Sequence, residues 1–146
     1  MQNIKEIPAI ETFSVRLPVL RAGKPIESCR FDGDDLETTR HFGLFLENNL
    51  TGVISIFKAQ SKLFVEESQF QIRGMAVLEH HQKKGFGEAL IRHAEDYIKI
   101  QNGTMIWFNA RIVAVGFYEK LGYQIIGDSF DIADVGEHYV QFKKIG

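Results

Sequence analysis

The clearest pattern of apolar and polar positions in the chain begins near Gly85 and has the period of an α-helix. Its polar side carries the charged residues Glu88, Arg92, Glu95, Asp96 and Lys99. Its other side is apolar and consists of Phe86, Ala89, Leu90, Ala94, Tyr97 and Ile98. This division predicts a helix that packs one face on a core, and Gly103 suits its termination.

Three segments before this helix have the pattern of strands. Residues 41–47 alternate loosely, and residues 52–57 place Val53, Ser55 and Phe57 on one side. A turn sequence, Asn48-Asn49, separates the two segments, so they predict an antiparallel hairpin. Residues 70–77 predict a further strand, which ends just before a polar loop.

The chain after the helix alternates between short apolar runs and one more helical pattern. Residues 105–108 predict a buried strand, and residues 113–121 have apolar positions at helical spacing up to Gly122. Residues 123–126 and 138–142 predict closing strands. The order of hairpin, strand, helix, strand, helix and strands predicts a mixed α/β sheet.

The N-terminal third carries weaker patterns. Residues 10–21 have apolar positions close to helical spacing, but Pro18 makes a straight helix doubtful there. Pro25 and the acidic stretch 32–35 predict a loop. We interpret the acidic stretch either as a solvated turn or as a group that attracts a cationic molecule.

Composition narrows the class of protein. The 146 residues, 45% of them hydrophobic and 25% charged, predict a single globular domain spanning residues 1–146. A single cysteine, no secretory pattern and no apolar run of about 18 residues predict a cytoplasmic protein without a membrane span. A net charge of −2 argues against a nucleic-acid partner, so any anion site must be local.

The most informative segment joins the strand that ends near Val77 to the helix that begins near Gly85. The first N–H groups of a helix have no internal partner and favour negative charge, and glycines let the backbone approach a phosphate closely. Lys83 and Lys84 add positive charge. The segment therefore predicts a phosphate or diphosphate site. It matches neither a P-loop, because Glu88 follows the second glycine, nor a dinucleotide fingerprint, whose third glycine is replaced by Leu90.

The spacing Gln82-x-x-Gly85-x-Gly87 resembles the Gln/Arg-x-x-Gly-x-Gly/Ala signature of the GNAT superfamily of N-acetyltransferases. The resemblance extends over roughly residues 70–142. It includes Met75-Ala76-Val77 at the end of the preceding strand, Asn109 after the next strand, and Phe-Tyr-Glu-Lys-Leu-Gly-Tyr at residues 117–123. The N-terminal half, including His41-Phe42-Gly43, is similar only loosely.

The resemblance implies a fold and a reaction. The fold is a mostly antiparallel central sheet flanked by helices, and homodimers are common in the family. The reaction is direct transfer of an acetyl group from acetyl-CoA, the cosubstrate, to an amine of unknown identity. It also implies that the diphosphate of CoA lies on Gln82, Lys83, Lys84, Gly85, Phe86 and Gly87, and that the pantetheine arm pairs with the backbone of Met75, Ala76 and Val77.

Two downstream residues receive roles from the same resemblance. Tyr118 is implied as the acid that protonates or hydrogen-bonds the departing CoA thiolate. Its alternative is a half-buried packing aromatic. Asn109 is implied as a partner of the pantetheine amides, and its alternative is the N-cap of the helix that follows.

The general base stays open. Candidates are a chain of waters and the side chains of Asp32, Asp34, Asp35, Glu79, Glu137 and His138. Cys29 has no paired base in sequence, so we expect no covalent acyl carrier. His80-His81 lacks further ligands at metal spacing, and we expect no metal. Arg73 and Arg92 are interpreted as lining the phosphate groove or as surface charges.

Two other functions remain as hypotheses. The same fold can bind acyl-CoA without catalysis, as a sensor or a scaffold, although Tyr118 favours an enzyme. A nucleotide-phosphate site is the third hypothesis, and it requires ATP or NAD to bind where CoA does not. The sequence does not identify the acceptor.

Overall fold

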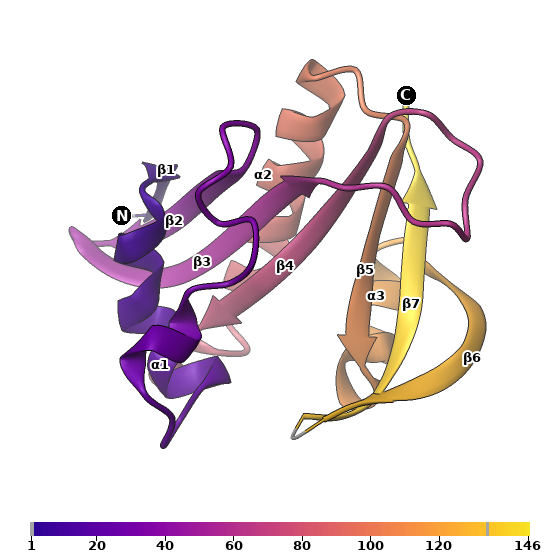
Figure 1. Ribbon diagram of the computed structural model, residues 1–146. Coiled ribbons are helices and arrows are strands. Elements are labelled where there is room, and N and C mark those ends of the chain that lie inside the picture. Colours follow the sequence, from indigo (N-terminus) through magenta and orange to yellow (C-terminus); the bar gives the residue numbers. More distant parts are fainter. Residues whose placement is uncertain (1, 134) are drawn as a thin grey trace.

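The computed structural model describes residues 2–133 and 135–146, which form one seven-stranded sheet with helices on both faces (Figure 1). The strands are β1 (Gln2–Ile7), β2 (Arg40–Leu46), β3 (Asn49–Lys58), β4 (Gln69–Val77), β5 (Met105–Arg111), β6 (Gln124–Ile132) and β7 (Gly136–Lys144). The helices are α1 (Phe13–Leu20), α2 (Phe86–Ile100) and α3 (Val115–Lys120). Short 3-10 turns lie at η1 (Ala9–Thr12), η2 (Ile26–Cys29), η3 (Glu79–His81) and η4 (Ile112–Ala114).

The strand order is β1-β2-β3-β4-β5-β7-β6. Every neighbouring pair is antiparallel except β4 and β5, which run parallel and are connected through α2. The predicted mixed, mostly antiparallel sheet flanked by helices is therefore confirmed. No helix within the described part of the chain is long and apolar enough to cross a membrane.

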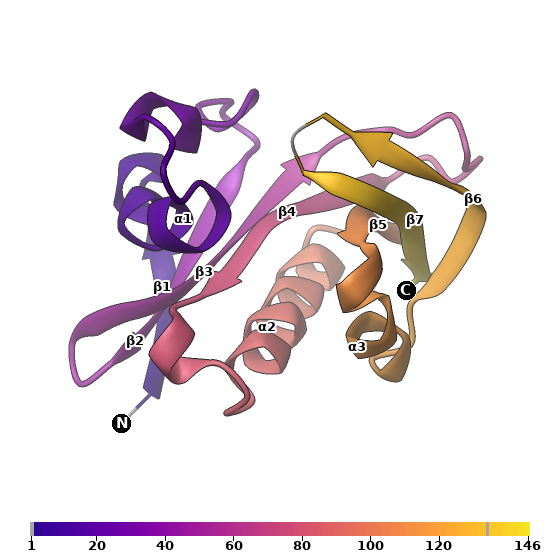
Figure 2. The same cartoon turned by 90° about the horizontal axis from the view of Figure 1, so that it is seen from below.

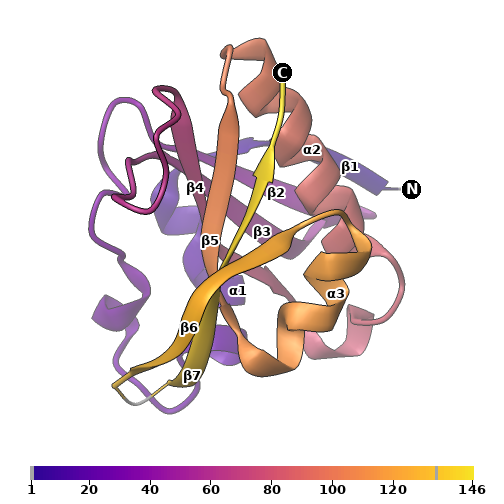
Figure 3. The ribbon, with the colours of Figure 1, turned by 90° about the vertical axis from the view of Figure 1, so that its right-hand side faces the viewer.

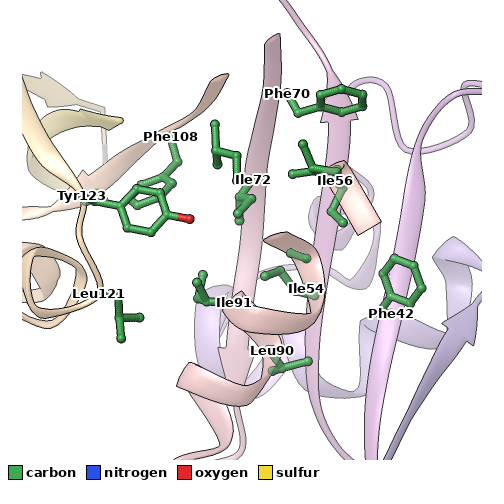
Figure 4. Close-up of a cluster of buried hydrophobic side chains, with 14 of the residues drawn as sticks. Phe42, Ile54, Ile56, Phe70, Ile72, Leu90, Ile91, Phe108, Leu121 and Tyr123 are labelled. Carbon is green, nitrogen blue, oxygen red and sulfur yellow. The ribbon is translucent and has the colours of Figure 1, made fainter. Parts of the chain in front are cut away.

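The helices divide between the two faces of the sheet, as Figure 2 shows. On the face that we call the α2 face, α2 buries Leu90, Ile91, Ala94 and Ile98 against the middle strands, and α3 joins the same cluster (Figure 4). On the opposite face, the α1 face, Val15 packs with Ile7, Val53 and Ala76. Both helices thus stabilise β3 and β4 from opposite sides.

The strongest sequence patterns are confirmed. The hairpin 41–57 forms β2 and β3, with Glu47 and Asn48 at positive φ in the turn, and α2 begins directly after Gly85. The helical pattern at 113–121 is split into η4 and α3, and the two closing strands extend beyond the predicted ranges. The helix expected near residues 10–21 forms as the short α1 with Pro18 inside it.

The acidic stretch 32–35 is not a solvated turn throughout. Asp34 has a fully buried side chain that accepts a 2.6 Å hydrogen bond from Nη1 of the equally buried Arg16. Burial alone would raise the pKa of Asp34, but the hydrogen bonds from Arg16 and from the Phe31 N–H outweigh it and lower that pKa. Asp35 pairs at the surface with Arg30. The buried ion pair therefore fixes the loop onto β3, where Arg16 also donates to Ser55.

Candidate functional site

The central feature of the candidate site is a gap in the sheet between β4 and β5. The two strands pair only where Gln69–Gln71 face Met105–Trp107, and beyond that point they separate (Figures 1 and 3). The rest of β4 is paired with β3 alone. The edge of β4 that faces the gap therefore presents backbone N–H and C=O groups that a ligand can pair with.

A β-bulge shapes β4 beside the gap. The step from Val53 to Ser55 on β3 is opposite the longer step from Ala76 to Arg73 on β4, so β4 carries one extra residue. Gly74 lies in this bulge with φ 65°, and a Cβ there would lie 2.9 Å from Cε2 of Phe31. Glycine suits this position both because of its positive φ and because of the close contact. The bulge therefore interrupts the regular backbone of β4 directly before Met75.

The N-terminus of α2 lies next to this strand end. Gly85 caps the helix with φ 86° and without a side-chain cap, and the first intrahelical bond is from Ala89 N–H to Gly85 O at 3.1 Å. The preceding Lys83 also has positive φ, at 63°, and both lysines are exposed. The N–H groups of the first turn therefore meet solvent with two cations beside them, as an anion site requires.

Contacts within the loop explain the positions of Gln82 and Gly87. Gln82 Nε2 donates a 2.9 Å hydrogen bond to the Val77 carbonyl, so this side chain ties the loop to the end of β4. A Cβ at Gly87 would lie 3.4 Å from the Phe117 ring and 3.5 Å from Cε of Met75. The glycine thus lets α2 start close to both β4 and α3, while Phe86 is half-buried near the His81 ring.

Tyr118 lines the cavity at the gap from the side of α3. Its ring packs on Phe108 at 4.4 Å between centroids and on Phe117 at 5.1 Å. Burial raises the pKa of Tyr118 to about 12, so the hydroxyl stays protonated at neutral pH. No hydrogen bond to that hydroxyl forms from residues 2–133 or 135–146. The residue is both a packing aromatic and the bearer of a proton donor at the cavity.

Asn109 lies in β5 opposite Val140 and lines the same cavity with an exposed side chain. The alternative prediction of a helix cap is wrong, because Arg111 precedes η4 and Ala114 precedes α3 at the capping positions. The chain needs two further residues and the turn η4 before the helix starts. Asn109 is therefore free to face a ligand in the gap.

Among the candidate bases, His138 is the one that lines the cavity. Its side chain is 4% exposed, its ring stacks on Phe130, and Nδ1 lies 2.7 Å from the Gly136 carbonyl oxygen. A carbonyl only accepts, so Nδ1 is the donor in this contact, and Nε2 is the ring nitrogen left to face a ligand.

The acidic side chains are less suited than His138 to act as the general base. Glu79 and Glu137 are exposed and lie outside the cavity lining, and Asp34 and Asp35 are held by arginines. Asp32 is exposed, and its backbone carbonyl accepts from Arg73. These pairings leave His138 or water as the groups best placed to remove a proton.

Arg73 and Arg92, whose roles the sequence leaves open, both have contacts outside the loop 82–87. Arg73 lines the cavity on the α1 face, where its guanidinium packs 5.3 Å from the Phe31 centroid, and Arg92 pairs with Glu88 and Glu95 on α2. Arg21, Phe31 and Arg111 also line the cavity, and no sequence pattern singled them out. Their positions carry no local motif, because they meet only through the sheet.

The cysteine and histidine candidates lie outside this chemistry. Cys29 is buried, its pKa is raised by that burial, and it does not line the cavity. Within the residues that the structure describes, no three of the His, Cys, Asp and Glu side chains gather as a metal-binding group. His81 packs near Phe86 instead, and His80 is exposed.

Known proteins resemble this chain in sequence over most of its length. Residues 9–123 match the family model described as the acetyltransferase (GNAT) family. The uncharacterized N-acetyltransferase YitI of Bacillus subtilis is 34% identical over 145 residues, which cover 99% of this chain and 97% of that protein.

Solved structures show the same fold at low sequence identity. An aminoglycoside 6'-N-acetyltransferase complexed with coenzyme A superposes with a TM-score of 0.76 at 14% identity, covering 97% of this chain and 96% of that one. An IAA acetyltransferase from Bacillus cereus gives a TM-score of 0.73 at 17% identity, covering 99% and 100%.

Proposed function

The chain belongs to the acetyltransferase (GNAT) family and is an N-acetyltransferase, and from this premise we propose how its residues bind acetyl-CoA and transfer the acetyl group. The family uses acetyl-CoA, and the gap between β4 and β5 is the site that we assign to its reactive end. The acceptor in this proposal is an amine.

The diphosphate of CoA lies, in this proposal, on the first turn of α2. Its oxygens accept hydrogen bonds from the N–H groups of residues 83–88, and Lys83 and Lys84 contribute charge. The backbone at Gly85 is open, because nothing lies within 4 Å of the position that a Cβ would take, and this leaves room for a phosphate. Gln82 contributes by holding the loop through Val77 rather than by direct contact.

The pantetheine arm then runs into the gap along the free edge of β4. Its amides pair with the backbone of Met75, Ala76 and Val77 as an added strand would. Asn109 offers a side-chain amide from β5 on the other side of the gap. A backbone N–H at the bulge next to Gly74 is suited to hold the thioester carbonyl oxygen as negative charge develops on it.

The acetyl transfer follows from the groups that line the cavity. The amine nitrogen, once deprotonated, attacks the thioester carbon, a C–N bond forms, and the C–S bond breaks. Nε2 of His138, directly or through water, takes the proton that the amine loses. Tyr118 gives a proton or a hydrogen bond to the departing thiolate, since its hydroxyl is protonated and the residue lines the cavity.

One observation carries this proposal: the unpaired edge of β4, the start of α2 and Tyr118 lie next to one another. Met75 and Phe117 both contact the position of Gly87, and Met75, Asn109 and Tyr118 line one cavity of about 460 Å³. A volume in this range suits the end of a cofactor arm together with a small acceptor group.

We expect acetyl-CoA to be cleaved in an amine-dependent manner. The measurement is release of the CoA thiol, followed with a chromogenic disulfide, across a panel of primary amines and with an amine-free control. The expected result is release that scales with both enzyme and amine concentration. If acetyl-CoA binds saturably and no amine in a broad panel raises the release rate, the chain acts as an acyl-CoA sensor or scaffold and the catalytic proposal is wrong.

A further inference from the structure

The charged residues that line the cavity are all of one sign. Arg21, Arg73 and Arg111 line it, and no aspartate or glutamate does so among the described residues. Arg73 and Arg21 belong to the α1 face, and Arg111 lies in β5 directly opposite His138. The cavity wall therefore differs in charge from the chain as a whole, which is net negative.

Arg73 is held in place by two aromatic rings and one backbone carbonyl. Its guanidinium packs over two aromatic rings, 5.3 Å from the Phe31 centroid and 5.0 Å from the Phe57 centroid. Its Nη1 donates to the Asp32 backbone carbonyl at 3.0 Å. Burial lowers the pKa of Arg73 by more than the nearby carboxylates of Asp34 and Asp32 raise it. This cation has therefore lost part of its hydration, and a further anion beside it would stabilise it.

Arg21 packs on one of these two rings and also donates to backbone carbonyls. Its guanidinium lies 4.8 Å from the centroid of the same Phe31 ring, and it donates to the carbonyls of Ser28 at 3.2 Å and Leu20 at 3.1 Å. In the part of the chain that the structure describes, neither Arg21 nor Arg73 forms a carboxylate ion pair. The neighbouring Arg16 stacks on this ring too, but Asp34 neutralises it.

Two oriented cations thus meet at one aromatic ring in the wall of the cavity, on the α1 face. A guanidinium group that donates one or two N–H groups to carbonyls still has other N–H donors, which can hydrogen-bond a planar or tetrahedral anion. An ammonium group alone would be repelled there. The positive charge of the cavity wall also argues against recruitment of a cationic acceptor by the acidic stretch 32–35. Within that stretch, the carboxylate of Asp34 is already paired with Arg16.

We propose that the acceptor is a small amine that also carries an anionic group, a carboxylate or a phosphate, which Arg21 and Arg73 bind while the amine reaches the acetyl carbon. This inference rests on the proposed function, because the amine must lie in the gap where acetyl-CoA presents its thioester. Its chemistry is independent of how CoA binds. Both arginines pack on Phe31 on the α1 face, whereas the loop 82–87 leads into α2, which lies on the opposite face of the sheet (Figure 2).

The test compares matched amines that differ only in the anion. The pairs are L-leucine with L-leucinamide, β-alanine with β-alaninamide, and O-phosphoethanolamine with ethanolamine, and spermidine serves as the polycation. The first two pairs report a carboxylate and the third reports a phosphate. At least one anionic member should exceed its neutral partner by about tenfold or more in kcat/KM, since hydrogen bonds to charged groups are typically worth that much.

Two substitutions assign the effect to the arginines. Arg73→Gln and Arg21→Gln should each raise KM for the preferred anionic amine by about tenfold, with little change for its neutral partner and none in acetyl-CoA affinity. Arg73→Lys should recover part of the loss because it keeps the charge. Arg40→Gln, which removes a surface arginine of β2 outside the cavity, is the matched control and should change neither value.

Calorimetry with acetyl-CoA alone distinguishes a failure of the proposed function from a failure of the anionic-acceptor proposal. Absence of acetyl-CoA binding contradicts the proposed function. With binding established, the anionic acceptor is overturned if the neutral partners or spermidine react as well as or better than every anionic amine, or if no anionic amine reacts. It is also overturned if a wild-type preference persists unchanged in a folded Arg73→Gln and in a folded Arg21→Gln.

Discussion

Replacement of Gly85 by aspartate is expected to abolish measurable acetyl-CoA binding while the protein stays folded. The new carboxylate would stand at the cap of α2, beside the N–H groups assigned to the diphosphate. Two unit charges 4 Å apart repel by about 4 kcal/mol at an effective dielectric constant of 20, so a loss of about 100-fold or more remains after screening. Calorimetry with acetyl-CoA measures the change.

The fold should tolerate this substitution. Nothing lies within 4 Å of a Cβ at Gly85, so the only cost is the positive φ of 86°, which is about 1 kcal/mol for a residue such as aspartate. Gly127→Asp is the matched control, because Gly127 in β6 also has positive φ, at 78°, and open space around it. That control should bind acetyl-CoA as the wild type does. A folded Gly85→Asp protein with wild-type affinity would mean that the phosphates lie elsewhere.

Replacement of Tyr118 by phenylalanine is expected to slow acetyl transfer by at least about tenfold, since general acids contribute roughly 10²- to 10⁴-fold. The ring would keep its contacts with Phe108 and Phe117, so acetyl-CoA affinity should hardly change. The rate must be measured in single turnover with an amine already known to react, because slow product release would mask the effect.

The pH dependence of this effect follows from the raised pKa. A tyrosine with a pKa of about 12 is protonated on both sides of neutrality and loses its proton only as the pH approaches that value. The ratio of wild-type to Tyr118→Phe rates should therefore be the same at pH 7 and at about pH 9. A ratio that collapses toward one between these values would show that a different group donates the proton.

A second tyrosine provides the control for packing. Tyr97 on α2 is half-buried against Phe42 and lies outside the cavity, so Tyr97→Phe should leave the single-turnover rate unchanged. Urea unfolding of both variants separates a catalytic loss from a stability loss. An unchanged rate in a well-folded Tyr118→Phe protein would reduce Tyr118 to a packing aromatic, while the CoA site on α2 would stand.

The elements that the sequence predicts well are those whose pattern is decided locally. The face of α2 repeats at 3.6 residues, and the hairpin of β2 and β3 is bounded by the turn at Asn48. The strand β1 escaped prediction because it is an edge strand with one buried residue, Ile7, at its end. The hydrogen bonds to β2 hold β1 in the extended conformation, and the residues of β1 show no alternation of apolar and polar positions that would predict a strand.

The candidate site likewise combines features that a local sequence pattern predicts with features that depend on tertiary packing. The loop 82–87 is contiguous, and its glycines and lysines predict an anion site without knowledge of the fold. The bulge at Gly74 depends on the register between β3 and β4, which a single strand sequence does not contain. Arg21, Phe31 and Arg73 come from three separate segments and gather only when α1 packs on the sheet, so their combined charge becomes visible in the structure alone.

A crystal structure of the protein with coenzyme A bound would test the central claim most directly. We expect density for the diphosphate at the N–H groups of residues 83–88, and for the pantetheine arm along Met75–Val77 in the gap between β4 and β5. The CoA sulfur should then lie within hydrogen-bond reach of the Tyr118 hydroxyl. Coenzyme A bound outside the gap, or bound with its sulfur remote from both Tyr118 and the Gly74 bulge, would contradict the proposed site.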